Sequence, residues 1–314
     1  MAKRVVADSY GGPEVLSLIE SDVPAPGPGE VTVRAMAIGV NPVDYKLYSG
    51  AMGADPAALP MPVGLELSGV VTAVGRDAEG PAGPLSVGDE VMVHPAPGAY
   101  ATELTVPASS VAPKPPELSW EEAAGLRLAG STAVHALTVT GVSEGETLLI
   151  HGASGGVGLL AVQIAVADGV RVIGTAGESH LDSVERYGAT AVRYGEGLRE
   201  RVREAAPGGV DAVIDASGTR EAIDLSLELV PDPGRIVSII AFDRADTGIK
   251  LIGGGPNADP GTEIRAGSWR KLAELAHQGE IEVVVARTYS LAEAADAHRF
   301  LADGHPGGKV VLLP

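Results

Sequence analysis

The sequence predicts an α/β protein in which a mostly β unit is followed by a doubly wound parallel sheet. Two observations lead to this fold. Residues 5–111 contain short strand-like runs that Gly and Pro interrupt at close intervals, which is typical of a compact β unit. From residue 147 onward, strand-like and helix-like segments alternate. A parallel sheet with crossover helices satisfies that alternation best.

The composition is that of a globular enzyme. The chain has 314 residues, 45% of them hydrophobic and 20% charged, which is enough for two domains with separate cores. The net charge of −18 without a dense Lys/Arg cluster argues against nucleic acid as a partner. No apolar run approaches the roughly 18 residues of a membrane span, and the first ten residues lack a signal-peptide core. We therefore expect a cytoplasmic protein.

Cysteine is absent from the sequence, which removes disulfides, thiolate nucleophiles and cysteine-containing zinc sites together. The histidines form no H-x-x-x-H pair, so no metal site is expected. A lone histidine is more often structural than a ligand. The histidines are His94, His135, His151, His180, His277, His298 and His305.

The boundary between the two domains is expected near residue 120. Strand-like runs begin at Val31 and Val70, and a proline cluster at residues 113–116 closes the β region. Ser119 precedes Glu122 by three residues, the spacing of a capping box at a helix start. We place the first domain at residues 1–121 and 263–314 and the second at residues 122–262.

The second domain is expected to alternate strands and helices. The strands are predicted at residues 147–151, 170–175, 191–194, 211–215 and 235–240, with helices from residue 157 and near residues 180–187. Two further helices, from Lys271 and Leu291, precede a last strand that begins at Lys309. Because so short a tail cannot fold alone, we expect it to pack back on the first domain.

A glycine-rich turn, G-A-S-G-G-V-G, follows the strand at residues 147–151 and precedes an apolar helix. This is the arrangement that holds a dinucleotide pyrophosphate at a helix N-terminus. Gly158 would let the helix pack close to the strand. The spacing is G-x-x-G-x-x-G, so an ordinary strand-to-helix turn is the alternative. The predicted pyrophosphate site comprises Gly152, Ser154, Gly155, Gly156 and Val157.

Four separated segments together resemble the zinc-independent quinone oxidoreductase branch of the medium-chain dehydrogenase/reductase superfamily. They are G-V-N-P-V-D-Y-K-L-Y-S-G from Gly39, P-V-G-L-E-L-S-G-V-V-T-A-V-G from Pro62, the glycine turn within residues 145–163, and R-T-Y-S-L-A-E-A-A-D-A-H-R from Arg287 with G-K-V-V-L after it. The resemblance implies a GroES-like β catalytic domain, completed by the C-terminal tail, and a Rossmann cofactor domain.

The resemblance also implies a function. It predicts an NADPH-dependent reductase that transfers hydride to a quinone or an activated enone without zinc, acting as a homodimer. An enoyl reductase of a biosynthetic pathway is the alternative among enzymes, and a non-catalytic NADPH-binding protein is the alternative outside them. Each of these proteins needs the same cofactor site.

Candidate residues for the substrate side come from the same resemblance. Asn41 is predicted to orient the substrate or the nicotinamide ribose, with a turn-forming Asn-Pro as the alternative. Tyr45 is a candidate proton donor, since a phenol is protonated at neutral pH, or an ordinary packed tyrosine. Thr132 is placed beside the nicotinamide or in a packed helix start. Glu66 is interpreted as structural.

The end of the second strand decides between NADH and NADPH. Positions 174 and 175 are Gly and Thr. An Asp or Glu at the end of this strand would hold the ribose hydroxyls and repel a 2′-phosphate. NADPH is therefore favoured, although Glu178 lies in the following loop and no basic residue directly follows that loop. The residues expected around the phosphate are Gly177, Ser179, His180, Tyr194 and Lys309, the last being otherwise a surface lysine.

Overall fold

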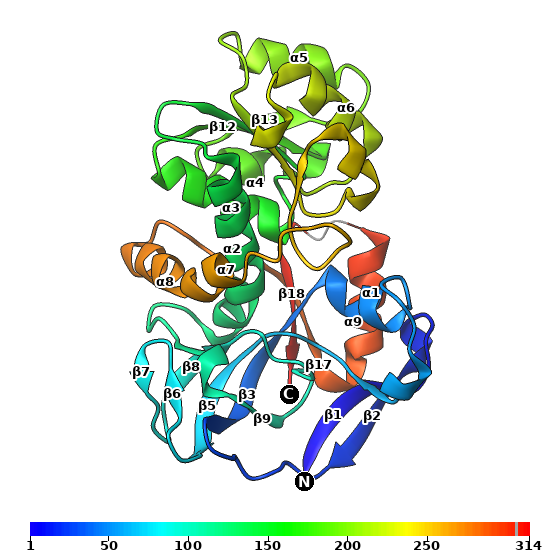
Figure 1. Ribbon diagram of the computed structural model, residues 1–314, viewed down its shortest axis with the longest axis vertical. Coiled ribbons are helices and arrows are strands. Elements are labelled where there is room, and N and C mark those ends of the chain that lie inside the picture. Colours follow the sequence, from blue (N-terminus) through cyan, green and yellow to red (C-terminus); the bar gives the residue numbers. More distant parts are fainter. Residues whose placement is uncertain (305–306) are drawn as a thin grey trace. The chain divides into compact units, whose positions relative to one another are not determined.

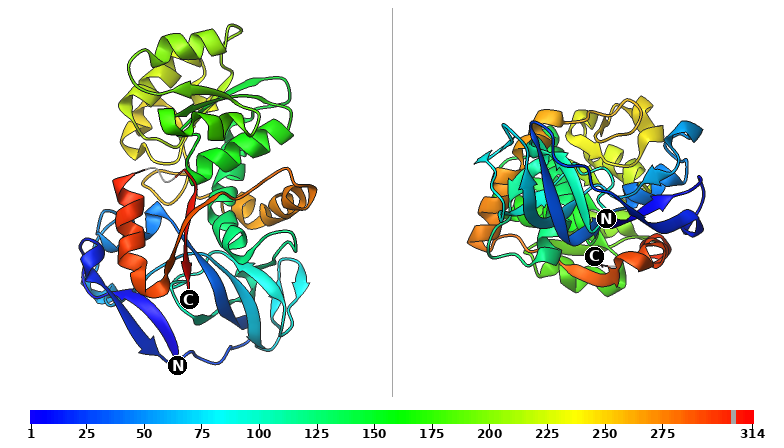
Figure 2. Two further views of the ribbon diagram at one scale, coloured as in Figure 1. Left: turned by 180° about the vertical axis from the view of Figure 1, so that it is seen from behind. Right: turned by 90° about the horizontal axis from the view of Figure 1, so that it is seen from below.

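The computed structural model of the chain, which describes residues 1–304 and 307–314, divides into two compact units. The first comprises residues 1–128 and 283–314, and the second residues 129–282. His305, one of the histidines considered above, lies outside the described residues. Both ends of the chain belong to the first unit, as the marked termini show (Figures 1 and 2).

The first unit is built mainly from β-strands. Its largest sheet has the order β10-β8-β5-β3-β18-β17, with β9 also paired to β3. The strands are β1 (Ala2–Ala7), β2 (Leu16–Ser21), β3 (Glu30–Val40), β4 (Met61–Pro62), β5 (Leu67–Val74), β6 (Glu79–Gly80), β7 (Gly83–Pro84), β8 (Glu90–Val93), β9 (Glu103–Pro107), β10 (Val111–Pro113), β17 (Val285–Ser290) and β18 (Lys309–Leu313). The helices are α1 (Pro42–Tyr48), α9 (Ala294–Asp303) and the start of α2 (Trp120–Thr140).

The C-terminal tail completes this first unit, as the sequence predicts. β18 pairs antiparallel with β3, so that Val311 lies opposite Gly39, and α9 packs near α1. Figure 1 shows the red β18 beside the blue β3, with the orange β17 on its other side. The buried Val310 and Leu312 join the same hydrophobic core as Val33 and Leu67. The last strand is therefore part of the core of a unit that begins about 300 residues earlier in the chain.

The second unit holds a six-stranded parallel sheet with the order β13-β12-β11-β14-β15-β16. This is the doubly wound order, with β11 at the centre. Its strands read as nearly continuous apolar runs, as expected where both faces are covered. The strands are β11 (Thr147–His151), β12 (Arg171–Ala176), β13 (Thr190–Arg193), β14 (Ala212–Asp215), β15 (Ile236–Ser238) and β16 (Lys250–Leu251). The helices are α3 (Gly156–Ala167), α4 (Leu181–Glu185), α5 (Leu198–Ala205), α6 (Arg220–Leu229), α7 (Thr262–Gly267), α8 (Trp269–Gln278) and the rest of α2.

The unit boundaries differ from the expected 121/122 and 262/263. The first division falls inside α2, which is one continuous helix. Residues 263–282 belong to the second unit, because they pack there: the Leu272 side chain lies against Gly130, and the backbone N–H of Glu282 donates to Gln163 Oε1 at 2.7 Å. The predicted capping box is confirmed, with Ser119 N–H donating to Glu122 at 2.7 Å.

Candidate functional site

The glycine turn between β11 and α3 has the backbone geometry that its sequence suggests. Gly152 has φ +73°, a backbone conformation that residues other than glycine rarely adopt. A Cβ added to Gly158 would clash with the carbonyl oxygen of Gly152, so only glycine lets α3 approach the strand so closely. At Gly155 the nearest atom to an added Cβ is 3.5 Å away. The turn itself therefore tolerates a side chain at Gly155, and the open space there suits a ligand.

This turn presents backbone donors at the carboxyl end of β11. Gly155 is the N-cap of α3 and makes no side-chain capping bond, and Gly156 and Val157 form the first turn of the helix. The first N–H groups of a helix carry partial positive charge and bind anions well. Ser154 is buried beside them. The structure thus brings the five predicted pyrophosphate residues together at one edge of the sheet.

The predicted ribose loop follows β12 at the same edge of the sheet. Gly177 leads into a 3₁₀ turn, Glu178–His180, and Ser179 is exposed. Ala176 is paired with Arg193 in the β12–β13 register. A Cβ on Gly177 would come within 3.3 Å of the Tyr194 hydroxyl. Tyr194 is 55% exposed, and its ring is therefore available next to this loop.

Arg193 is a residue at this edge that the sequence reasoning missed. Its Nε lies 3.6 Å from Glu178 Oε2, and both side chains are largely exposed. The signal was present in the sequence, because Arg193 lies at the end of the strand predicted at residues 191–194, directly before Tyr194. The carboxyl ends of parallel strands meet at one edge of a sheet. A cation therefore lies beside the ribose loop, on the neighbouring strand and not directly after the loop in sequence.

Thr132 lies on α2 in the second unit and is buried. Arg265 Nη1 donates to its hydroxyl at 3.1 Å, and Arg265 Nε donates to His135 Nδ1 at 3.2 Å. The other ring nitrogen of His135 is therefore protonated and donates to Asp259 at 3.2 Å. Arg265, which the sequence reasoning also missed, fixes the position of the Thr132 hydroxyl.

Asn41 is part of a buried polar cluster in the first unit. We call Asn41, Glu66 and Lys309 the Asn41 cluster. Asn41 Nδ2 donates to Glu66 Oε1 at 2.9 Å, and Lys309 Nζ donates to Asn41 Oδ1 at 2.6 Å and to Glu66 Oε1 at 3.0 Å. The N–H of Leu128 donates to Glu66 Oε2 at 2.8 Å. Burial opposes the charge on Glu66, but Lys309 and these donors hold its pKa below the usual value.

Lys309 therefore has a different role from either one expected for it. It is 6% exposed, so it is not a surface lysine, and its ammonium is bonded to Glu66 and Asn41, so it is not free to hold a cofactor phosphate. The reason is the pairing of β18 with β3, which carries Lys309 to the end of β3, next to Asn41. Glu66 is fully buried and bonded within the cluster, and its structural role stays a prediction.

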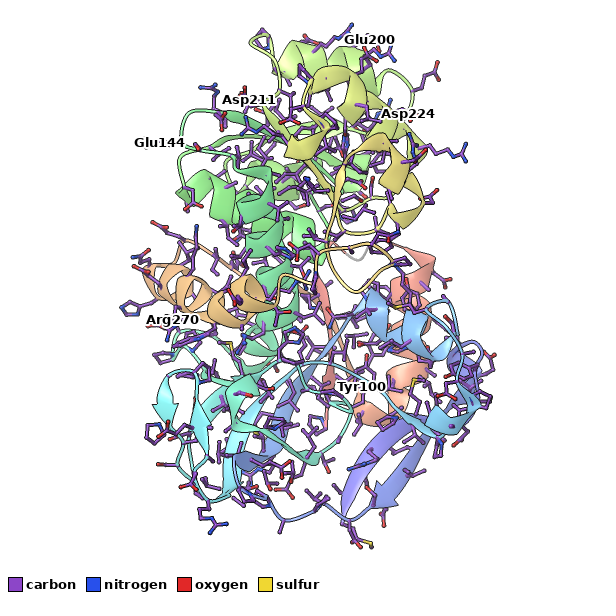
Figure 3. All side chains as sticks on the ribbon, in the orientation of Figure 1. Tyr100, Glu144, Glu200, Asp211, Asp224 and Arg270 are labelled. Carbon is purple, nitrogen blue, oxygen red and sulfur yellow. The ribbon has the colours of Figure 1, made fainter. Side chains whose placement is uncertain are left out.

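Asp44 connects the Asn41 cluster to a row of buried rings. The N–H of Asn41 donates to Asp44 Oδ2 at 2.8 Å, closing a capping box on α1. The Tyr100 hydroxyl, labelled in Figure 3, donates to the same oxygen at 3.0 Å. His298 Nε2 contacts Tyr100 at 2.8 Å, and His298 Nδ1 contacts the Tyr48 hydroxyl at 2.6 Å. Burial raises the pKa of Asp44 to about 7 and lowers that of His298 to about 4.

Tyr45 lies on α1 beside this row and is partly buried. Its ring meets His298 edge-on, with centroids 6.3 Å apart. Burial raises the pKa of the Tyr45 phenol, which therefore stays protonated at neutral pH. Tyr45 packs against the core of the first unit, so its ring behaves as that of an ordinary packed tyrosine. Its role as a proton donor stays a prediction.

Two absences are found in the part of the chain that the structure describes. Residues 1–304 and 307–314 contain no group of three His, Asp or Glu side chains placed to hold a metal ion. His94 Nδ1 lies 3.0 Å from the Leu65 carbonyl, and His151 is buried at the end of β11 with its pKa lowered to about 4. Over the same residues, no helix has both the length and the apolar character to cross a membrane.

The chain combines a doubly wound parallel sheet, with a glycine turn at its carboxyl edge, and a β unit that the C-terminal tail completes. This combination defines a dinucleotide-binding oxidoreductase. Comparison with known proteins agrees with this class. Residues 27–116 match the alcohol dehydrogenase GroES-like domain, and residues 181–312 match the zinc-binding dehydrogenase domain. The chain is 35% identical to a quinone oxidoreductase of Pseudomonas aeruginosa, over 100% of both chains. It belongs to the quinone oxidoreductase branch of the medium-chain dehydrogenase/reductase superfamily.

Solved structures give the same result. Mycobacterial Rv1454c complexed with NADPH is similar to this chain with a TM-score of 0.85 and 34% identity, covering 100% of both chains. The CurK enoyl reductase is similar with a TM-score of 0.86 and 25% identity, covering 99% of both chains. The predicted GroES-like and Rossmann folds are thereby confirmed.

Proposed function

We propose that this protein is an NADPH-dependent reductase that transfers hydride to a quinone or an activated enone and needs no zinc. The observation that carries the proposal is the turn at Gly152–Gly158 together with the ribose loop after β12, at one edge of one sheet. The similarity to a quinone oxidoreductase and to an NADPH complex supports it. The nicotinamide ring supplies the hydride when the cofactor is bound.

The residues of this chain bind and orient the reactants. Backbone N–H groups of Gly156 and Val157 would hold the pyrophosphate, and Thr132, fixed by Arg265, would meet the nicotinamide end. A conjugated carbonyl accepts hydride without a Lewis acid, so alignment and a donor to the developing oxyanion suffice. The Tyr45 phenol, protonated at neutral pH, is the candidate donor. Turnover should therefore survive exhaustive chelation, and chelator-sensitive turnover would contradict the zinc-independent part of the proposal.

We further propose that Arg193 reads the 2′-phosphate of NADPH and that Glu178 competes with the phosphate for it. A guanidinium suits a phosphate, whereas a carboxylate in the same loop repels it. Arg193→Gln is expected to weaken NADPH about fivefold to tenfold and leave NADH nearly unchanged, while Glu178→Gln should tighten NADPH. Arg199→Gln, which removes a similarly exposed arginine paired with Glu228, is the matched control.

The measurement is a fluorescence titration of both cofactors with each variant. Equal effects of Arg193→Gln on NADPH and NADH would refute the assignment of Arg193. Wild-type protein should prefer NADPH by roughly 1–2 kcal/mol, because one exposed arginine gives a single, partly screened contact. Equal dissociation constants for the two cofactors would contradict the choice of NADPH.

A second candidate function is enoyl reduction, which the similarity to the CurK enoyl reductase favours. A steady-state screen of NADPH oxidation against quinones, enones and enoyl thioesters separates the two. Asn41→Ala is expected to lower turnover more than it weakens NADPH binding, because the role proposed for Asn41 is to orient the acceptor against the nicotinamide. Silence towards all three substrate classes, with NADPH binding intact, would favour a non-catalytic binding protein.

A further inference from the structure

Arg127 is a buried cation whose hydrogen-bonding capacity is mostly unused. It lies on α2 within the first unit and is 3% exposed. Its Nη2 donates to the carbonyl oxygen of His94 at 3.2 Å. Its Nε and Nη1 are buried and have no hydrogen-bond partner among the described residues. One N–H on Nε and two on Nη1 are therefore unsatisfied.

The charge on Arg127 also lacks a carboxylate of its own. Burial lowers the pKa of its guanidinium to about 10, still far above neutrality, so the side chain is charged at neutral pH. Glu66 is the carboxylate whose field reaches it. Both Glu66 oxygens are already bonded, to Asn41, to Lys309 and to the N–H of Leu128. The single charge of Glu66 thus faces two buried cations.

The unsatisfied group calls for an anion and not only for water. Buried charges in proteins are almost always paired, and an uncompensated one costs several kcal/mol. Ordered water would satisfy the three N–H groups but would leave the charge without a counter-ion. The planar guanidinium matches the two oxygens of a carboxylate better than it matches a spherical ion.

We infer that Arg127 binds a small monovalent anion, by preference a carboxylate, enclosed in the first unit close to the Asn41 cluster. Such an anion would satisfy the free N–H groups and restore the local charge balance. It has two sources: a free small carboxylate, or the carboxylate of an acidic acceptor molecule. The inference does not depend on the proposed function, because binding is measured without NADPH and without turnover.

The test uses the full-length protein and sodium formate as the probe. Wild-type protein should show saturable formate binding by calorimetry and a matching saturable rise in Tm at constant ionic strength. Arg127→Met, which keeps much of the side-chain volume and removes the charge, should lose both responses. Arg127→Lys should weaken formate binding about tenfold, because an ammonium offers no planar pair of donors. The exposed Arg199→Gln variant should respond as the wild type does.

Two results would overturn the inference: no saturable formate binding by the wild type, or equal binding by Arg127→Met. If Arg127→Met does not fold, line broadening of ¹³C-formate by the wild type, with saturation at about tenfold higher formate for Arg127→Lys, provides the same decision. If an enone carboxylic acid competes with formate and the corresponding enone amide does not, the anion at Arg127 is the carboxylate of the acceptor molecule. Formate binding that leaves turnover unchanged would identify a free anion that stabilises the first unit. Both of these last results support the site.

Discussion

Replacing Lys309 by Met should destabilise the first unit strongly. The change leaves the Glu66 carboxylate, which is fully buried, with the Asn41 amide and one backbone N–H as its only donors described here. Removing one partner of a buried ion pair typically costs about 3–5 kcal/mol. For a domain of this size, that corresponds to a fall in Tm of roughly 6–20 °C. The affinity for NADPH, measured well below the transition, should change little, because Lys309 is bonded to Glu66 and not free for a phosphate.

The assay is urea unfolding followed by circular dichroism, with Lys3→Met, at an exposed lysine of the same unit, as the control. Glu66→Gln combined with Lys309→Met removes both charges and should be less destabilising than Lys309→Met alone. A Lys309→Met cost below about 1 kcal/mol would refute the reasoning, since that is the range of an exposed ion pair. Additivity of the two single changes would refute it as well.

Two further outcomes follow from the second unit. Gly155→Val should abolish dinucleotide binding in a fluorescence titration while the fold persists. Gly158→Ala should disrupt the turn itself, because its Cβ clashes with the backbone. Intact NADPH binding by Gly155→Val would contradict the assignment of the turn. The Arg235 guanidinium lowers the pKa of Glu146 from 4.5 to about 2, so the pair should stabilise the fold above pH 4.5 and lose this effect as the pH falls towards 2. The expected loss is roughly 1–2 kcal/mol after solvent screening, and an Arg235→Gln variant with the same acid stability as the wild type would show that the pair contributes nothing.

Local patterns were enough to predict the parts of the fold that depend on neighbouring residues. The strand at residues 309–313 has the predicted start, and the helix after Ser119 begins where the capping box placed it. The strand expected at residues 235–240 is shorter, Ile236–Ser238. Arg235 lies outside it because Pro233–Arg235 forms a 3₁₀ turn, in which the Gly234 N–H donates to the side chain of Asp232.

The candidate site divides in the same way. The glycine turn is one continuous segment of the sequence, and so is the ribose loop. Their residues could therefore be named from spacing alone. The positions of Lys309 beside Asn41 and of Arg193 beside the ribose loop arise from strand pairing, which sets a residue beside one that is distant in the chain. Arg127 gives no signal in the sequence at all, because an arginine on a helix is usually solvated, and only its burial makes it unusual.

The insertion of β18 next to β3 has a consequence for the order of folding during synthesis. Residues 129–282 form one continuous stretch, so this unit can complete its sheet while the ribosome is still adding the C-terminal segment. The N-terminal unit cannot do so, because residues 38–40 of β3 stay unpaired along one edge and Glu66 lacks the Lys309 ammonium until the C-terminal segment has left the exit tunnel. The part of the chain made first should therefore be the last to reach its native state, and a chaperone that covers exposed strand edges should act on it during that interval.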